Sequence, residues 1–136
     1  MKAQSSMEML FSLATFIALL LPVLFLALTM AQLNEEKLSK AQARAALNIL
    51  EDTANRVYLG GNTAMEEVTL MLPYSVNDFT IEGKEIKAKL STGDEIVTYT
   101  MPNLIYASEG KAISGTVTLC LRNKDGDVEV TPGRCG

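Results

Sequence analysis

From Met9 to Ala31 the chain reads MLFSLATFIALLLPVLFLALTMA, a run of 23 residues without one charged side chain. At about 1.5 Å per residue, a helix of this length is roughly 35 Å long, which exceeds a bilayer hydrocarbon core of about 30 Å. The run is apolar all round, so as a helix it needs apolar surroundings on every side, either lipid or other copies of itself. We therefore expect a membrane-competent helix.

Pro22 lies in the middle of this run. Proline has no backbone N–H and deletes one helical hydrogen bond, so Pro22 predicts a kink or a short unwound stretch. Two other interpretations of the run are an ordinary anchor helix and a secretory signal that is cleaved before Gln32. The signal is disfavoured because the run exceeds the usual apolar core of a signal peptide and because Glu8 precedes it.

The helical pattern continues beyond Ala31 with a different character. Apolar residues recur at spacings of three and four, which is typical of an amphipathic helix. They form two series, Leu38, Ala41, Ala45 and Ile49, and Ala46, Leu50, Ala54 and Val57. Gly60-Gly61 supplies the stop signal. We expect one helix from about Ser5 to Tyr58, with an apolar half at 9–31 and an amphipathic half at 32–59 that packs on a globular head.

Residues 60–136 carry the excess negative charge and show the period-two patterns of β-strands. The alternating runs lie at 68–72, 79–81, 86–90, around Ile96, 117–121 and 128–130. Turn signals separate them at Glu82-Gly83, Thr92-Gly93-Asp94 and Asp125-Gly126, and such short loops predict antiparallel hairpins. The sequence therefore predicts an α+β chain in which a long N-terminal helix precedes a small antiparallel β-rich head of about six strands.

Composition argues against several classes of function. The net charge of −4 disfavours nucleic acid as a partner, because phosphate binding needs a basic face. The chain has no histidine, which removes the usual general base and the commonest zinc ligand. The stretch from Asn123 to Asp127 matches a calcium loop only in part and is better explained as a hairpin turn. We expect no enzyme activity, no cofactor and no metal.

The chain opens with MKAQSSMEML, in which Glu8 directly precedes the apolar run. A carboxylate next to an apolar run is costly to bury, so Glu8 needs either a partner of opposite charge or a specific role at this position. Local helix chemistry offers one interpretation: Ser5 or Ser6 caps the helix, and Glu8, three residues after Ser5, completes a capping box.

The same residues resemble the class III signal peptide of archaeal type IV pilin-like proteins. Lys2-Ala3-Gln4 corresponds to the cleavage motif of that family, and the stretch from Gln4 to Leu10 corresponds to the start of its mature chains. The resemblance implies removal of a leader, residues 1–3, by a prepilin peptidase that cuts between Ala3 and Gln4. Glu8 then becomes the fifth residue of the mature chain. The resemblance extends to about residue 58 and implies a lollipop-like pilin fold, with the head, 60–136, matching only in general plan.

In that family the apolar helices assemble into a filament, so the resemblance implies a homopolymeric type IV pilus-like filament at the cell surface that presents its heads for adhesion. It also implies an assembly ATPase and a membrane platform protein as partners, and insertion of the subunit in the membrane before assembly. A new amino group at Gln4 can neutralise Glu8 in the same or a neighbouring subunit, which makes both residues candidates for a role in assembly. The alternatives are a membrane-anchored extracytoplasmic binding domain, a minor pilin of a secretion or DNA-uptake apparatus, and an archaellum subunit.

Cys120 and Cys135 both lie in the predicted head. After an exported segment, an even cysteine count favours a disulfide, and type IV pilins often carry a disulfide loop near the C-terminus. Two unpaired buried thiols are the alternative, as is a metal site, which two cysteines without histidine cannot complete.

Overall fold

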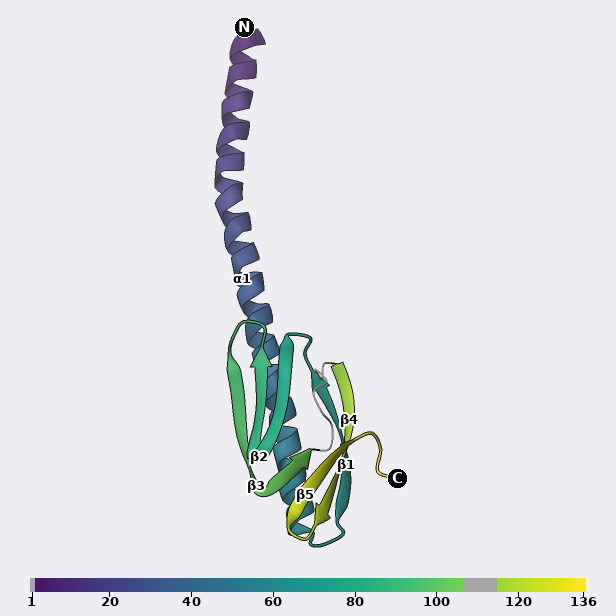
Figure 1. Cartoon of the computed structure of the whole chain (residues 1–136). Helices are drawn as coiled ribbons and strands as arrows, with labels where there is room; N and C mark the ends of the chain where they lie inside the picture. The colour runs from purple at the N-terminus through teal and green to yellow at the C-terminus, as the bar shows by residue number, and fades with distance from the viewer. Residues whose placement is uncertain (1, 107–114) are drawn as a thin grey trace. The chain divides into compact units, whose positions relative to one another are not determined.

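The computed structural model describes residues 2–106 and 115–136, and these residues form one long helix and five strands (Figure 1). The elements are α1 (Lys2–Leu59), β1 (Met65–Leu72), β2 (Val76–Leu90), β3 (Glu95–Tyr106), β4 (Gly115–Lys124) and β5 (Asp127–Pro132). Residues up to Lys37 form one compact unit, and residues from Leu38 to Gly136 form a second unit, called the head unit below. The predicted α+β class is confirmed.

The five strands form one sheet in the order β1-β4-β5-β3-β2. All pairs are antiparallel except β3 with β5, in which Leu104 lies opposite Val128. The short loops do join antiparallel hairpins, β2–β3 and β4–β5, as predicted, whereas the parallel β3–β5 pair was not anticipated. Strand β4 pairs with β1 instead of returning to β3, and the β4–β5 hairpin then places β5 alongside β3 in the same direction.

The Glu82-Gly83 signal is not a turn, and two of the six predicted strands are therefore one strand. Strand β2 continues through Gly83, where the pairing register with β3 shifts before Glu85. Gly83 has φ 58°, a left-handed conformation that suits glycine, so the residue that resembled a turn former lies instead at a register shift within the strand. The other two turn predictions are confirmed, at Thr92-Gly93-Asp94 and at Asp125-Gly126.

The core of the head unit lies between one face of the sheet and one side of the helix. Leu47 and Leu50 from α1 are almost fully buried, as are Leu70 and Leu121 from β1 and β4 and Val130 from β5. Of the two apolar series expected on the amphipathic half, only the one containing Ala46, Leu50, Ala54 and Val57 is buried. The other series is exposed, with Leu38 at 60% and Ile49 at 49% of their full exposure. The sheet therefore covers only one of the two apolar stripes on this part of the helix.

Asn123, on β4, joins the C-terminal end of α1 to the sheet and is only 4% exposed. Its side-chain amide donates to the carbonyl oxygens of Val57 and Tyr58, at 3.3 and 3.1 Å. The last carbonyls of a helix have no partner within the helix, so these two bonds act as a cap supplied by a distant strand. The Oδ1 atom of Asn123 accepts a hydrogen bond from Gly126 N at 3.1 Å, which fixes the β4–β5 turn. One buried side chain thus holds the helix end and the hairpin together.

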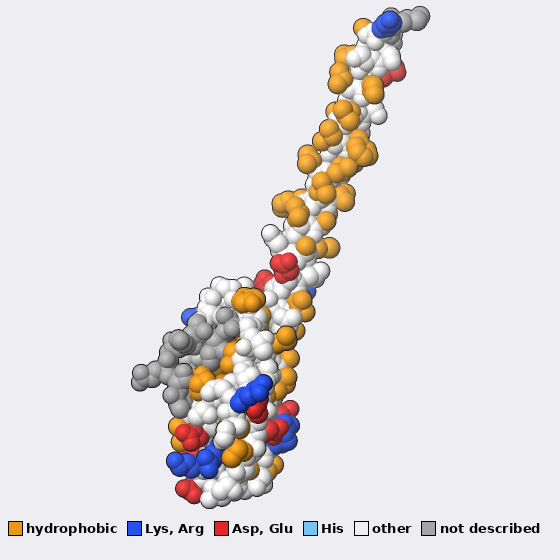
Figure 2. Space-filling view, turned by 90° about the vertical axis from the view of Figure 1, so that its right-hand side faces the viewer, with side chains coloured by type: hydrophobic (Ala, Val, Ile, Leu, Met, Phe, Trp, Pro, Cys, Tyr) orange, Lys and Arg blue, Asp and Glu red, His pale blue; other side chains and the backbone are white. Residues whose placement is uncertain are grey.

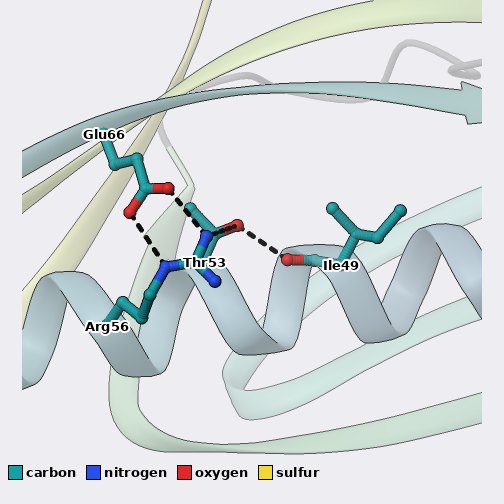
Figure 3. Close-up of polar contacts among 4 residues, drawn as sticks. All are labelled: Ile49, Thr53, Arg56 and Glu66. Carbon is teal, nitrogen blue, oxygen red and sulfur yellow. Dashed lines mark hydrogen bonds and ion pairs between the residues drawn. The ribbon is translucent and has the colours of Figure 1, made fainter.

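Arg56 makes a second connection, between α1 and β1 (Figure 3). Its guanidinium donates to both carboxylate oxygens of Glu66, at 2.7 and 3.3 Å. The hydrogen bond to Glu66, and next the charge of Glu66, raise the pKa of Arg56 above its usual value. The guanidinium also contacts the hydroxyl of Thr53, which itself donates to the carbonyl of Ile49 at 2.7 Å. Because the ion pair is exposed, it contributes mainly to orientation and little to stability.

Cys120 and Cys135 form a disulfide, so this prediction is confirmed. The bond joins β4 to the C-terminal residues that follow β5 and closes a loop with a sequence separation of 15. In the chain-entropy view, closing a loop of this length stabilises the folded state by about 3 kcal/mol.

We predict that Asn123→Ala lowers the free energy of unfolding by about 2–3 kcal/mol, because it removes the side-chain donor of the buried Val57 carbonyl and one of the two donors of the Tyr58 carbonyl, and also the acceptor of Gly126 N. The measurement is denaturant unfolding of the full chain in detergent micelles, followed by circular dichroism. Asn77→Ala is the matched control, since Asn77 is exposed on β2 and is expected to change stability by less than about 0.5 kcal/mol. Equal stability of the two variants would show that the cap is unimportant.

Candidate functional site

The candidate site is the N-terminal part of α1, in which every described residue from Lys2 to Leu38 is exposed. Large apolar side chains cover this segment between the charged residues that flank it (Figure 2). Phe11 is 78% exposed, Phe16 is 62% exposed and Phe25 is 70% exposed. In the described part of the chain, α1 is the one helix that is long and apolar enough to cross a membrane. The segment needs cover, and neither its own unit nor the sheet supplies it.

Two polar groups inside the apolar run are satisfied within the helix itself. The hydroxyls of Thr15 and Thr29 donate to the carbonyls of Phe11 and Phe25, both at 2.9 Å. A threonine that bonds to the carbonyl four residues earlier presents little unsatisfied polarity to its surroundings. The sequence analysis did not predict these two hydrogen bonds. A threonine within a predicted helix can bond to the carbonyl four residues earlier, so the positions of Thr15 and Thr29 in the apolar run could have indicated them.

At Pro22 the helix continues without interruption. The sequence predicted either a kink or a short unwound stretch at Pro22, and the structure does not show the unwound stretch. The bend remains a prediction. Proline still leaves the carbonyl four residues earlier without its usual donor, so this turn is the weakest point of the apolar half.

The opening motif forms the described beginning of α1. Lys2, Ala3 and Gln4 are helical and exposed; Met1, the first residue of the expected leader, lies outside the described residues. The helix already includes Ser5, Ser6 and Glu8, and its first turn holds no acidic residue. The capping interpretation is therefore wrong: Ser5 and Ser6 are not at the N-terminus of the helix, because the helix extends at least three residues further towards the start of the chain.

Glu8 lies on the exposed surface of the helix, and within residues 2–106 and 115–136 no ion pair includes it. Gln4 precedes Glu8 by four residues, and residues four apart lie on the same face of a helix. The spacing therefore places the backbone at Gln4 on the Glu8 side of the helix.

The described residues contain no group of three or more His, Cys, Asp or Glu side chains that could hold a metal ion. The chemistry of the candidate site is instead that of one carboxylate beside a long uncharged helix surface. Such a surface can exclude water and pack, and the carboxylate can pair with one positive charge.

A long apolar N-terminal helix that continues into a segment packed on a mostly antiparallel sheet is a pilin-like architecture. Comparisons with protein-family models, with curated proteins and with solved structures give no match. Inferences about function therefore depend on the residues of this chain and on the geometry described above.

Proposed function

We propose that this chain is a pilin, a structural subunit of an archaeal type IV pilus-like filament at the cell surface. The observation that supports this most strongly is the direct junction of the Lys2-Ala3-Gln4 and Glu8 motif with 23 uncharged residues, none of which is covered in the structure. A plain membrane anchor has no need for a cleavage motif before its apolar segment, or for a carboxylate at this position.

In the proposed assembly, the apolar half of α1 first lies in the membrane and then packs among identical helices in the filament core. The exchange replaces lipid by equally apolar side chains, so close packing and not hydrophobic transfer favours the assembled state. The self-satisfied hydroxyls of Thr15 and Thr29 are compatible with both environments. Extraction from the membrane requires work, which we assign to an assembly ATPase acting through a membrane platform protein.

The proposed location of the head is outside the cell. The apolar helix suggests membrane insertion or secretion, and the Cys120–Cys135 disulfide is consistent with an extracytoplasmic location, because disulfides persist mainly in oxidising compartments. Heads on the outer surface of a filament are then available for adhesion to surfaces or to other cells.

Glu8 has a specific role in this proposal. Cleavage after Ala3 creates an ammonium group at Gln4, four residues before Glu8 and on the same side of the helix. Two opposite charges in a water-free helix core are tolerable as a pair, whereas a single unpaired charge costs several kcal/mol. Pairing of Glu8 with this ammonium, in the same subunit or in a neighbouring one, therefore favours a defined alignment of the helices.

We predict that the mature chain begins at Gln4. Mass spectrometry of the intact protein from a membrane or surface fraction of an archaeal host that has the processing peptidase measures this directly. A chain that begins at Met1 would indicate a plain anchor, and a chain that begins at Gln32 would indicate a secreted soluble domain. Either of these results would contradict the proposal.

We further predict that Glu8→Gln lowers the yield of sheared filaments by about tenfold or more, because the ammonium at Gln4 then has no carboxylate partner. Glu35→Gln is the matched control: it removes the same charge from an exposed position of the same helix, just beyond the apolar run. Its filament yield is expected to equal that of the unmodified chain. If Glu8→Gln filaments form at the control yield, the pairing role is wrong.

A further inference from the structure

The few polar features of the apolar run lie on one side of the helix. Successive residues of an α-helix are about 100° apart around its axis, so the three hydroxyl residues Ser12, Thr15 and Thr29 fall within an arc of about 100°. Pro22 and Glu8 fall within the same arc. The remainder of the circumference is apolar along the whole run. Another molecule that packs on this side therefore meets hydrogen-bonding groups, whereas one that packs elsewhere on the run does not.

The unpaired acceptor on this side is the carbonyl oxygen of Ala18. In an α-helix this oxygen accepts a hydrogen bond from the N–H four residues later, and that residue is Pro22, which has no N–H. The helix continues through Pro22 without unwinding. In lipid or in a water-free filament core no solvent donor replaces the missing N–H, and a carbonyl without a partner is costly there. A donor from outside the helix is therefore favoured.

The unpaired donor on this side is the hydroxyl of Ser12. The two threonines of the run donate to carbonyls of their own helix, both at 2.9 Å, whereas the Ser12 hydroxyl makes no hydrogen bond to the described residues around it. Within its own helix this hydroxyl can reach the carbonyl of Glu8, but that oxygen already accepts the backbone N–H of residue 12. A bond to the Ala18 carbonyl instead satisfies two groups at once.

Ser12 and Ala18 cannot meet within one chain, because six residues separate them by about 9 Å along the helix axis and about 120° around it. We infer that the Ser12 hydroxyl of one copy donates to the Ala18 carbonyl oxygen of a neighbouring copy. The inference rests on the proposed function, because it requires copies to pack in parallel. Since donor and acceptor lie on different flanks, each copy can donate to one neighbour and accept from another. Repetition of such a heterologous contact builds an open filament.

This hydrogen bond defines an axial offset of about 9 Å between the two copies. The same offset brings Gln4 of the donating copy level with Leu10 of the accepting copy, only about 3 Å along the axis from Glu8. A glutamate side chain is long enough to span this difference, so the ammonium at Gln4 and the carboxylate of Glu8 can pair between the same two copies. One offset therefore satisfies both the hydroxyl–carbonyl pair and the charged pair.

The test is a double-mutant cycle on filaments of the full chain, with Pro22→Ala as the second variant because it restores the N–H that the Ala18 carbonyl lacks. We expect Ser12→Ala to lower the yield of sheared filaments by about threefold or more in the unmodified chain, and by less than about 1.5-fold in the Pro22→Ala chain. Thr15→Val is the matched control, because it removes a hydroxyl that bonds within its own helix. Only subunits whose mass shows a start at Gln4 are counted, which separates assembly from processing.

Two results of the cycle would overturn the inference. A filament yield of Ser12→Ala equal to that of Thr15→Val would show that the Ser12 hydroxyl has no role in assembly. Equal losses from Ser12→Ala with and without Pro22→Ala would show that this hydroxyl acts on a group other than the Ala18 carbonyl. Either result leaves the proposed function intact, whereas the proposed function itself fails if the unmodified chain forms no filaments.

A cysteine pair measures the offset independently of yield. Filaments assembled from a mixture of Ser12→Cys and Ala18→Cys copies are expected to form a disulfide between positions 12 and 18 on oxidation, identified by mass spectrometry of the joined peptides. Phe25→Cys replaces Ala18→Cys in the control mixture, because position 25 lies on the same side of the helix but about 10 Å further along it. Absence of the 12–18 link, or links from 12 to 25 at the same yield, would overturn the inference.

Discussion

The exclusion of water from residues 9–31 is the constraint on which the rest of this molecule depends. Each large apolar side chain moved out of water contributes about 1.5–3 kcal/mol, and about two thirds of the residues in this segment carry such side chains. None of them is buried in the single chain. The segment therefore needs lipid or other protein around its whole circumference. The self-bonded threonines and the absence of charge suit it to either environment.

The remainder of α1 packs on the sheet and forms part of the core of the head unit. Between Leu38 and Leu59 one apolar stripe of the helix is buried under the sheet. Asn123 of β4 caps the last carbonyls of the helix, and an exposed ion pair between Arg56 and Glu66 connects the helix to β1. The second stripe stays exposed, with Leu38 at 60% and Ile49 at 49% of their full exposure. An apolar stripe is normally covered, so its exposure in one copy is explained most simply by cover from another copy in the assembly proposed above.

Long-range patterns were easier to predict from the sequence than local signals. The long helix, the buried series at Ala46 to Val57 and the β-rich head follow from the period of the apolar residues, which burial dictates directly. Gly83 was misinterpreted because the left-handed conformation of a glycine suits a register shift within a strand as well as a turn, and only the pairing with β3 decides between them. The parallel β3–β5 pair could not be predicted, because strand order depends on contacts between residues that are distant in sequence.

At the candidate site, the sequence identified the apolar run and the opening motif but misplaced the start of the helix, since serines can favour an N-cap or lie within a helix. Asn123 was interpreted only as part of a turn. Its capping of a helix that ends some 65 residues earlier has no local signal in the sequence.

The central claim is that copies of this chain cover one another's apolar helices. A cryo-electron-microscopy reconstruction of material sheared from cells that produce and process the full chain tests it most directly. The account predicts helical filaments in which residues 9–31 of every subunit lie in a water-free core surrounded by the heads. Recovery of the chain only as single subunits in the membrane fraction, or filaments in which this segment faces solvent, would contradict it.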